Sequence, residues 1–211
     1  LKNSCTKLIH LYYADDRMDI FNGRQKLADQ DRVHEWVIAA RYGDQGAFKN
    51  LVKRYESQVA ATVIGMLGDC SEAEDIGQET FIRFYQNLHA FRGESDVGTY
   101  ITRIAINLSL NELKRRKRKR GMFSITSPDE MVDLPGQDQP DSFNEDKEIV
   151  QHALKKLDPK FRAVLALRLM GGYSTAETSE ILNIPVGSVM SRLFYGRKRL
   201  KKYLDKVLKE I

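Results

Sequence analysis

Cysteine and histidine are scarce in this chain of 211 residues, and the few that are present are widely spaced. The two cysteines, Cys5 and Cys70, form no CxxC pair, and the four histidines are scattered along the chain. A disulfide framework needs several cysteines, and a zinc site needs Cys or His ligands at close, regular spacing. The sequence therefore argues against both, and we expect no metal and no cofactor.

Long apolar runs are also missing. None approaches the roughly 20 residues that a membrane-spanning helix requires. The first residues lack the basic segment, apolar core and small-residue cleavage site of a secretory signal. We therefore expect a cytoplasmic protein without membrane insertion.

Proline is limited to five residues, and three of them, Pro128, Pro135 and Pro140, fall in one short stretch. Residues 121–146 around them carry seven acidic side chains and no Lys or Arg. Clustered prolines and solvated charge are typical of a tether between domains. We expect a flexible acidic linker over residues 121–145.

Positive charge is abundant and uneven. The formal net charge is +5, and residues 114–120 are seven consecutive cations. Seven adjacent cations repel one another, and a nucleic-acid backbone would neutralise them. A solvated, partly frayed helix end is the alternative interpretation of this basic tract.

The apolar residues recur at spacings of three and four, and no segment alternates with the period of a strand. The expected fold is all-α, with two small helical domains at residues 31–120 and 146–211. Residues 1–30 form an extension whose role the sequence does not indicate.

Several residues predict where helices begin and end. Gly68 is a plausible C-terminal cap, and Asp158 followed by Pro159 predicts an N-cap with proline at the first helical position. Two Ser-x-x-Glu capping boxes, Ser71 to Glu74 and Ser174 to Glu177, predict further helix starts.

Residues 174–200 read as a short helix, a tight turn and a longer helix, which is the arrangement of a helix-turn-helix. One stripe of the longer helix can pack inward: Val189, Leu193, Gly196 and Leu200. The other face offers hydroxyl and guanidinium groups, which read base edges and bind phosphates: Ser188, Ser191, Arg192, Tyr195 and Arg199. The alternative is an ordinary amphipathic pair of helices with a solvated basic face.

The helix expected after Ser71 has an acidic start, in the sequence EAEDIGQETF at residues 72–81. Favourable interaction with the helix macrodipole explains acids at this end without any function. Because DNA is an unsuitable partner for an acidic face, any function here would be the binding of a protein.

Three segments together resemble bacterial RNA polymerase sigma factors of the extracytoplasmic-function type, in the sigma-70 family. Residues 72–81 resemble the family's D-A-E-D-L-V-Q-E-x-F motif, and residues 97–107 resemble F-x-x-W-L-x-R-I-A-x-N. Residues 184–193 resemble I-P-x-G-T-V-K-S-R-L of region 4. The motifs occur in the family's order, and only regions 2 and 4 are present, as in this subgroup.

The resemblance implies a promoter-specificity subunit that binds core RNA polymerase, melts the −10 element and has no catalysis of its own. It implies docking on the clamp helices of the largest subunit through Asp75, Gln78, Glu79 and Phe81. It implies further contacts with the flap of the second subunit, and a probable anti-sigma factor as inhibitor.

The resemblance also implies two contacts with promoter DNA. The single-stranded −10 element would be held by Phe91, Arg92, Tyr100, Arg103, Asn107, Asn111, Lys114 and Arg115. The duplex −35 element would be held by the polar face of the last helix, from Ser188 to Arg199.

Two other classes of function compete with this interpretation. A dimeric helix-turn-helix regulator of duplex operators would use residues 174–200 but leaves residues 72–107 without a role. A nuclease would need clustered carboxylates or histidines for metal or acid–base chemistry. The acids lie at helix starts or in the linker, so we expect no catalytic residue.

Overall fold

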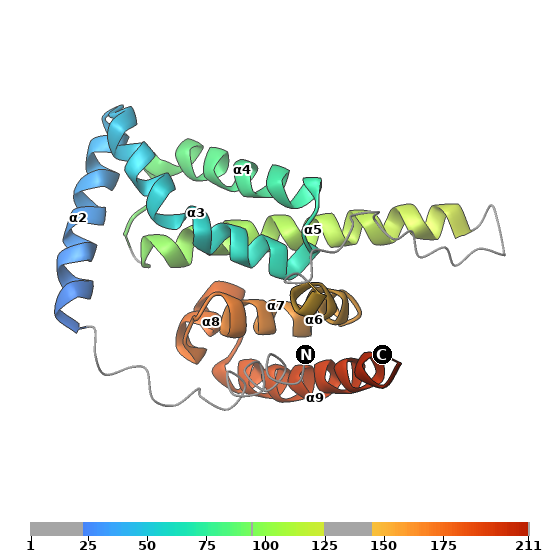
Figure 1. The fold of residues 1–211 in the computed structure, drawn as a ribbon. Coiled ribbons are helices and arrows are strands. Elements are labelled where there is room, and N and C mark those ends of the chain that lie inside the picture. The colour runs from blue at the N-terminus through green and yellow to red at the C-terminus, as the bar shows by residue number, and fades with distance from the viewer. Residues whose placement is uncertain (1–22, 94, 125–144, 211) are drawn as a thin grey trace.

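The chain forms an assembly of helices in two groups (Figure 1). The structure is a computed structural model that describes residues 23–93, 95–124 and 145–210. Most of the expected extension at residues 1–30 therefore lies outside the described residues. Its last part belongs to a helix, because α2 (Gly23–Arg41) begins before the expected start at residue 31.

The first group, which we call the first domain, contains four α-helices and a short 3₁₀ turn. They are α2, α3 (Gln45–Leu67), α4 (Ser71–Gln86), η1 (Leu88–Ala90) and α5 (Val97–Ser124). Helix α3 begins at Asp44, whose carboxylate accepts hydrogen bonds from the backbone N–H groups of Gly46 and Ala47. It ends at Gly68, which adopts a positive φ of 82°, so the predicted C-terminal cap is confirmed.

The predicted capping box at Ser71 is wrong. The N-cap of α4 is Cys70, whose carbonyl oxygen accepts from the N–H groups of Ala73 and Glu74. Ser71 already lies inside the first turn, and its hydroxyl donates to the Glu72 carboxylate at 3.4 Å. The helix begins one residue earlier than the sequence motif indicates, and a cysteine cannot be recognised as a cap by residue type.

The second group, which we call the second domain, follows the linker. It contains α6 (Glu145–Lys155), α7 (Pro159–Leu165), the π-helical turn η2 (Ala166–Met170), α8 (Thr175–Leu182) and α9 (Val186–Glu210). Asp158 is the N-cap of α7 and Pro159 its first residue, as predicted, but the side chain of Asp158 makes no capping hydrogen bond. It forms an ion pair with Arg199 at 3.0 Å instead.

The second predicted capping box, at the start of α8, is confirmed. Ser174 Oγ accepts from the N–H of Glu177 at 3.2 Å, and the Glu177 carboxylate accepts from the N–H of Ser174 at 2.7 Å. Two N–H groups that have no partner inside the helix are thereby satisfied.

This difference between the two serines predicts a difference in stability. Ser174→Ala should lower the free energy of unfolding by about 1 kcal/mol, because it removes a side-chain cap. Ser71→Ala is the matched control and should change it by less than about 0.5 kcal/mol, since no cap is lost. Urea unfolding of the full chain, followed by circular dichroism, measures both. Equal losses in the two variants would contradict the assignment of the caps.

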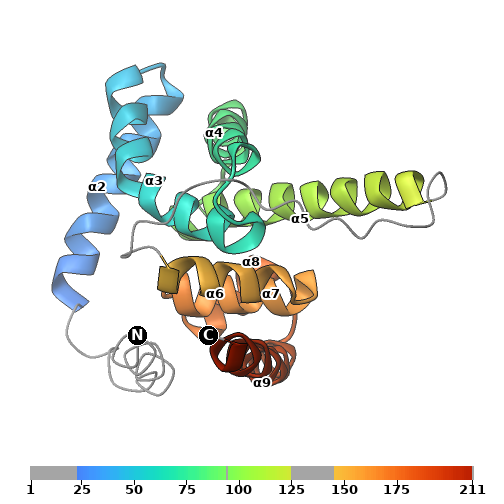
Figure 2. The same cartoon turned by 45° about the vertical axis from the view of Figure 1, so that its right-hand side comes forward.

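The two domains lie against each other, which the sequence did not indicate. Figures 1 and 2 show α6, α7 and α8 directly beneath α3 and α5. A single buried cluster spans both domains, and its members from the second domain are Ala163, Ala166, Leu167, Tyr173 and Ile181. A second cluster joins α6, α7 and α9.

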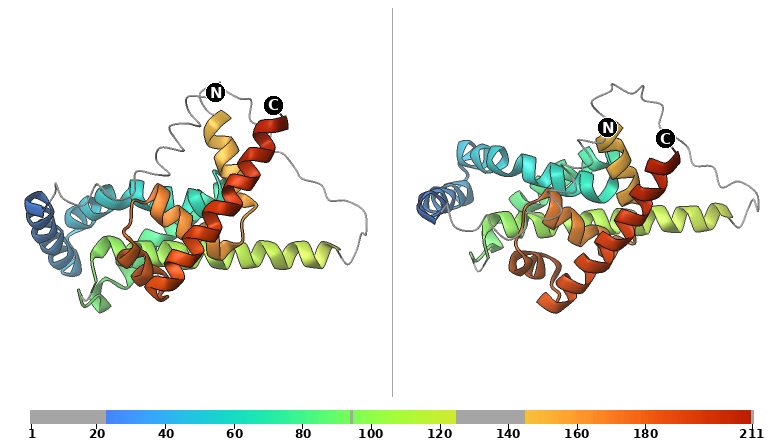
Figure 3. Two further views of the ribbon diagram at one scale, coloured as in Figure 1. Left: turned by 90° about the horizontal axis from the view of Figure 1, so that it is seen from below. Right: turned by 60° about the horizontal axis from the view of Figure 1, so that its bottom comes forward.

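The ends of the linker are helical. Helix α5 continues through Ser124, and α6 begins at Glu145, so the predicted linker over residues 121–145 is shorter than expected at its start. Its acidic middle part lies outside the described residues. In Figure 3, α9 crosses the underside of the molecule, and the basic end of α5 projects beyond the helices around it.

Candidate functional site

Helices α8 and α9 form the predicted helix-turn-helix. The turn passes through Asn183, which adopts the left-handed conformation with φ 50°. The predicted inward stripe of α9 is buried along its length: Val189, Leu193, Gly196 and Leu200. An added Cβ at Gly196 would lie 3.3 Å from Leu165, so glycine allows α9 to approach α7 closely here.

The five residues predicted to contact the −35 element differ in how exposed they are and in what they contact. Ser191 and Tyr195 are exposed, whereas Ser188 and Arg192 are half-buried. Arg199 pairs with Asp158, and its guanidinium lies 4.6 Å from the centre of the Phe161 ring. Arg199 is itself exposed, and in this arrangement its guanidinium is engaged at the start of α7.

Two apolar side chains on this face were missed by the sequence analysis. Phe194 is 64% exposed and Met190 is 56% exposed, although both are large and apolar. The rings of Phe194 and Tyr195 contact each other at 5.3 Å. A helical projection places Phe194, Ser191 and Lys198 on the side of α9 opposite the buried stripe. The exposure of Phe194 could therefore have been predicted from the sequence.

The aromatic residues expected at the −10 site lie close together at the start of α5. Tyr100 is half-buried and packs on Phe91 at 4.9 Å and on Phe84 at 6.1 Å between ring centroids. Phe91 itself is buried and belongs to the core. In this arrangement Phe91 supports the ring of Tyr100, and only Tyr100 offers partly exposed aromatic surface.

The loop between η1 and α5 is held at both ends. Arg41, from the last turn of α2, donates to the carbonyl oxygens of Leu88, at 3.0 Å, and of Phe91. Asp96 caps α5 by accepting from the N–H of Gly98 at 2.8 Å. Arg92, between these anchors, is exposed. Arg41 has no motif around it that would have predicted this role.

The exposed face of α5 collects the polar residues predicted for single-stranded DNA. Asn107, Asn111, Lys114 and Arg115 are exposed along it. Arg103, at the start of this face, is instead held by α8: its Nη2 donates to the Glu180 carbonyl at 3.0 Å and lies 3.5 Å from the Glu180 carboxylate.

The basic tract at residues 114–120 is partly neutralised within the protein. The buried Glu112 carboxylate accepts from Arg115 at 2.6 Å and from Arg116 at 3.0 Å. The hydrogen bond from Arg115 is the main reason that the pKa of Glu112 lies below its usual value. The tract therefore does not depend on nucleic acid for all of its neutralisation. Among those of its side chains that the structure describes, Lys114, Lys117, Arg118 and Lys119 are exposed and lie apart from Glu112.

The acidic face of α4 continues into apolar surface. Asp75 and Gln78 are exposed, while Glu79 is half-buried and pairs with Arg83 at 2.7 Å. Phe81 is half-buried and packs against the core. Ile82, which no sequence motif singles out, is 50% exposed one turn beyond Gln78.

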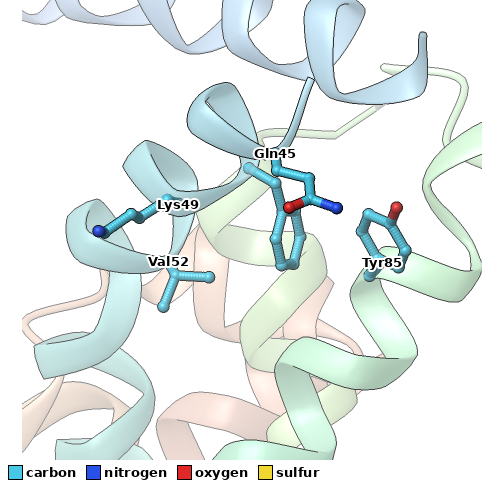
Figure 4. Close-up of a pocket in the computed structure, with 5 residues that line it drawn as sticks. Gln45, Lys49, Val52 and Tyr85 are labelled. Carbon is cyan, nitrogen blue, oxygen red and sulfur yellow. The ribbon is translucent and has the colours of Figure 1, made fainter. Parts of the chain in front are cut away.

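An open groove of about 470 Å³ adjoins this face between α3 and α4 (Figure 4). It is lined by Gln45, Phe48, Lys49, Val52 and Tyr85. The rings of Phe48 and Tyr85 meet edge to face at 4.8 Å. The exposed stripe of α4 and this groove together form a surface with polar and apolar parts, as protein-binding surfaces have.

Buried polar side chains join the two domains. Tyr173, 5% exposed, places its hydroxyl between Gln58 and Thr102, which both hydrogen-bond to it. Burial raises the pKa of Tyr173 to about 12. Arg162 donates across the contact to the Met66 carbonyl at 2.8 Å, and burial lowers the pKa of Arg162 to about 10.

The described residues contain no group of three or more His, Cys, Asp or Glu side chains placed to hold a metal ion. None of the described helices is both long and apolar enough to cross a membrane.

Comparison with known protein families gives two matches. Residues 51–119 match the model of Sigma-70 region 2, and residues 147–200 match that of Sigma-70 region 4. The first match covers α4 and most of α5, and the second covers the helix-turn-helix. A dimeric operator-binding regulator is not favoured, because it gives no role to the first match.

Curated relatives and solved structures agree with these matches. The chain is 34% identical over 180 residues to the ECF RNA polymerase sigma factor SigW of Bacillus subtilis, covering 82% of this chain and 96% of SigW. It is 30% identical to the RNA polymerase sigma-H factor of Pseudomonas aeruginosa, covering 86% and 98% of the two chains.

Among solved structures, similar folds are found in two sigma complexes. CnrH in complex with the cytosolic domain of CnrY has a TM-score of 0.64 at 22% identity, covering 83% of this chain and 98% of that one. RpoE in complex with the anti-sigma factor NepR from Bartonella quintana has a TM-score of 0.60 at 22% identity, covering 75% and 96%.

Proposed function

The chain belongs to the extracytoplasmic-function sigma factors of the sigma-70 family, and from this premise we propose how its three surfaces divide the work of promoter recognition. One helix face, on α4, is acidic and apolar, whereas two others, on α5 and α9, are polar and basic. The proposal rests on this observation: one chain presents one surface suited to binding a protein and two surfaces suited to binding nucleic acid.

The face of α4 docks on core RNA polymerase, at the clamp helices of the largest subunit. Gln78, Ile82 and Tyr85 form its exposed stripe, with Asp75 and Glu79 beside them. Apolar side chains at the centre and charges at the rim are the usual composition of a specific protein interface. The helix-turn-helix domain makes the second polymerase contact, at the flap of the second subunit.

The face of α5 captures the −10 element as a single strand. Tyr100 supplies an aromatic surface for an unpaired base, and Asn107 and Asn111 supply hydrogen-bond donors and acceptors. Lys114 and the exposed cations after it lie along the same helix and neutralise phosphates. Strand separation is then driven by binding, because captured bases favour the open state.

Helix α9 enters the major groove of the −35 element. Ser191, Tyr195 and Arg192 supply polar contacts, and Phe194 with Met190 adds an apolar surface suited to thymine methyl groups. The exposed lysines farther along α9 lie where they can bind the backbone. The protein acts in the cytoplasm with polymerase and catalyses no reaction of its own.

An anti-sigma factor covers the DNA-binding surfaces when transcription is not induced. Phe194 and Met190 are exposed apolar side chains, and such surface marks contact sites on soluble proteins. Purification of the native chain from uninduced cells with polymerase as its sole stoichiometric partner would count against this inhibitor.

The test of the docking surface is co-elution with bacterial core RNA polymerase on size exclusion. Wild type should co-elute stoichiometrically, and a Gln78→Ala/Glu79→Ala variant should bind at least about tenfold more weakly, which corresponds to 1.4 kcal/mol. The matched control, Asn107→Ala/Asn111→Ala, removes two polar side chains from α5 and should bind polymerase normally. No co-elution of the wild type, with tight binding to duplex DNA alone, would contradict the proposal.

A further inference from the structure

The loop that leads into the −10 site is held by a side chain from a distant helix. We propose that Arg41, in the last turn of α2, is a positioning residue for capture of the −10 strand, because it fixes residues 88–91, which support the ring of Tyr100. The inference rests on the proposed function, since it concerns the same DNA site. The match with Sigma-70 region 2 begins at residue 51, so Arg41 precedes the matched residues.

One guanidinium group connects the two ends of residues 88–91. Arg41 Nε donates to the carbonyl oxygen of Leu88 at 3.0 Å, and Nη2 of the same side chain donates to that of Phe91. The guanidinium is a planar, rigid fork of donors, which a lysine ammonium does not reproduce. Leu88 is fully buried. Arg41 therefore fixes the path of the chain from its buried end at Leu88 to the start of the loop at Phe91.

A purely local role for Arg41 explains only part of these contacts. A cation in the last turn of a helix is stabilised by the helix macrodipole, whatever else it contacts. That effect requires no partner in another segment, whereas the two acceptors of Arg41 lie 47 and 50 residues later in the chain. The two hydrogen bonds therefore stabilise the position of the loop, which the macrodipole alone does not.

Phe91 connects this anchor to the aromatic surface of the site. Its ring is 7% exposed, and its centroid lies 4.9 Å from that of Tyr100. On another side Tyr100 contacts the buried ring of Phe84, at 6.1 Å between centroids. A ring whose orientation is fixed before binding loses less conformational entropy when a base stacks on it. Removal of Arg41 releases the Phe91 carbonyl and weakens the support of the Tyr100 ring.

The far end of the loop is fixed separately. Asp96 caps α5 by accepting from the N–H of Gly98 at 2.8 Å. Gly93, with a φ of 76°, turns the chain between the two anchors, and a Cβ added there would meet no described atom within 4 Å. The loop is therefore positioned mainly from its ends, and Arg92, which is exposed and follows Phe91 directly, also depends on the Arg41 anchor.

The test compares holoenzymes reconstituted from core RNA polymerase and full-length variants. Fluorescein-labelled single strands, selected from a random pool by the wild-type holoenzyme, are the probes in an anisotropy assay. Arg41→Met should weaken binding about fivefold to tenfold, and Arg41→Lys, which keeps the charge without the fork, about twofold to threefold. Arg32→Met removes an exposed cation from the same helix and should bind as wild type does.

Two further readouts separate positioning from direct contact with DNA and from a general loss of structure. Lys114→Met should lower the slope of log affinity against log salt by about 0.7, the contribution of one phosphate contact with a single strand. Arg41→Met should leave this slope unchanged. In a Tyr100→Ala background, Arg41→Met should weaken binding by less than about twofold, because its effect acts through the Tyr100 ring.

The outcomes also separate this inference from the proposed function. Wild-type affinity of Arg41→Met and Arg41→Lys for the selected strands overturns the positioning role and leaves the proposed function standing. A lower salt slope in Arg41→Met, or its full effect in the Tyr100→Ala background, overturns it too, since Arg41 would then bind DNA itself or support the fold. A wild-type holoenzyme that selects no single strand from the pool contradicts the −10 assignment, and the positioning role with it.

Discussion

Replacing Phe194 by alanine should weaken binding of the polymerase-bound protein to −35 duplexes about tenfold to a hundredfold. The ring is mostly exposed in the free protein, so its removal costs little folding energy. Burying it against the major groove would contribute about 1.5–3 kcal/mol, the usual value for a phenylalanine side chain. Duplexes selected from a random pool by the wild-type holoenzyme provide the binding assay.

The control for Phe194→Ala is Tyr203→Ala, an exposed aromatic about two and a half turns farther along α9. It should bind the selected duplexes within about threefold of wild type. Both variants should bind core polymerase normally. Loss of polymerase binding together with duplex binding in Phe194→Ala would show that the ring supports the fold of α9, and would contradict its role in reading DNA.

Replacing Arg162 by methionine should lower the free energy of unfolding by about 2–4 kcal/mol. The guanidinium is 5% exposed and donates to three carbonyl oxygens, those of Met66 at 2.8 Å, Lys155 at 2.5 Å and Leu157 at 2.9 Å. Methionine fills the space of the aliphatic stem but donates nothing, so buried acceptors lose their partner. Relief from desolvation of the cation offsets part of the loss.

Urea unfolding of the full chain measures the Arg162 effect. Arg162→Lys keeps the charge with a different donor geometry and should fall between wild type and Arg162→Met. Lys160→Met, on the exposed side of the same helix, should stay within about 0.5 kcal/mol of wild type. An unchanged unfolding midpoint for Arg162→Met would contradict the assigned role of its three hydrogen bonds.

The helices were largely predictable because their apolar residues follow the helical period. The inward stripe of α9 and the capping box at Ser174 are local patterns, and both are confirmed. The box at Ser71 failed because the extended residue Cys70 is the N-cap and Ser71 already lies in the first helical turn, which residue types do not reveal. The residue types near a helix end predict its boundary well where only one residue there suits the capping position.

The contacts between distant segments could not be predicted in the same way. Tyr173 reads as an ordinary apolar position after a Gly–Gly turn, and its partner Gln58 lies 115 residues earlier. Arg199 shares a helical face with Ser191 and Tyr195, but Asp158 and Phe161 hold it on α7. Such pairs depend on how helices pack, and a single sequence contains no periodic signal for them.

Transcription by the reconstituted enzyme is the decisive test of promoter recognition by this chain. Core RNA polymerase would be mixed with the chain and fragmented genomic DNA from its source organism, and the 5′ ends of the transcripts sequenced. We expect transcripts that require the chain, begin downstream of a shared two-part motif, and decline when Phe194→Ala replaces wild type. Binding of the chain to core polymerase without any chain-dependent transcript would contradict its role in promoter recognition.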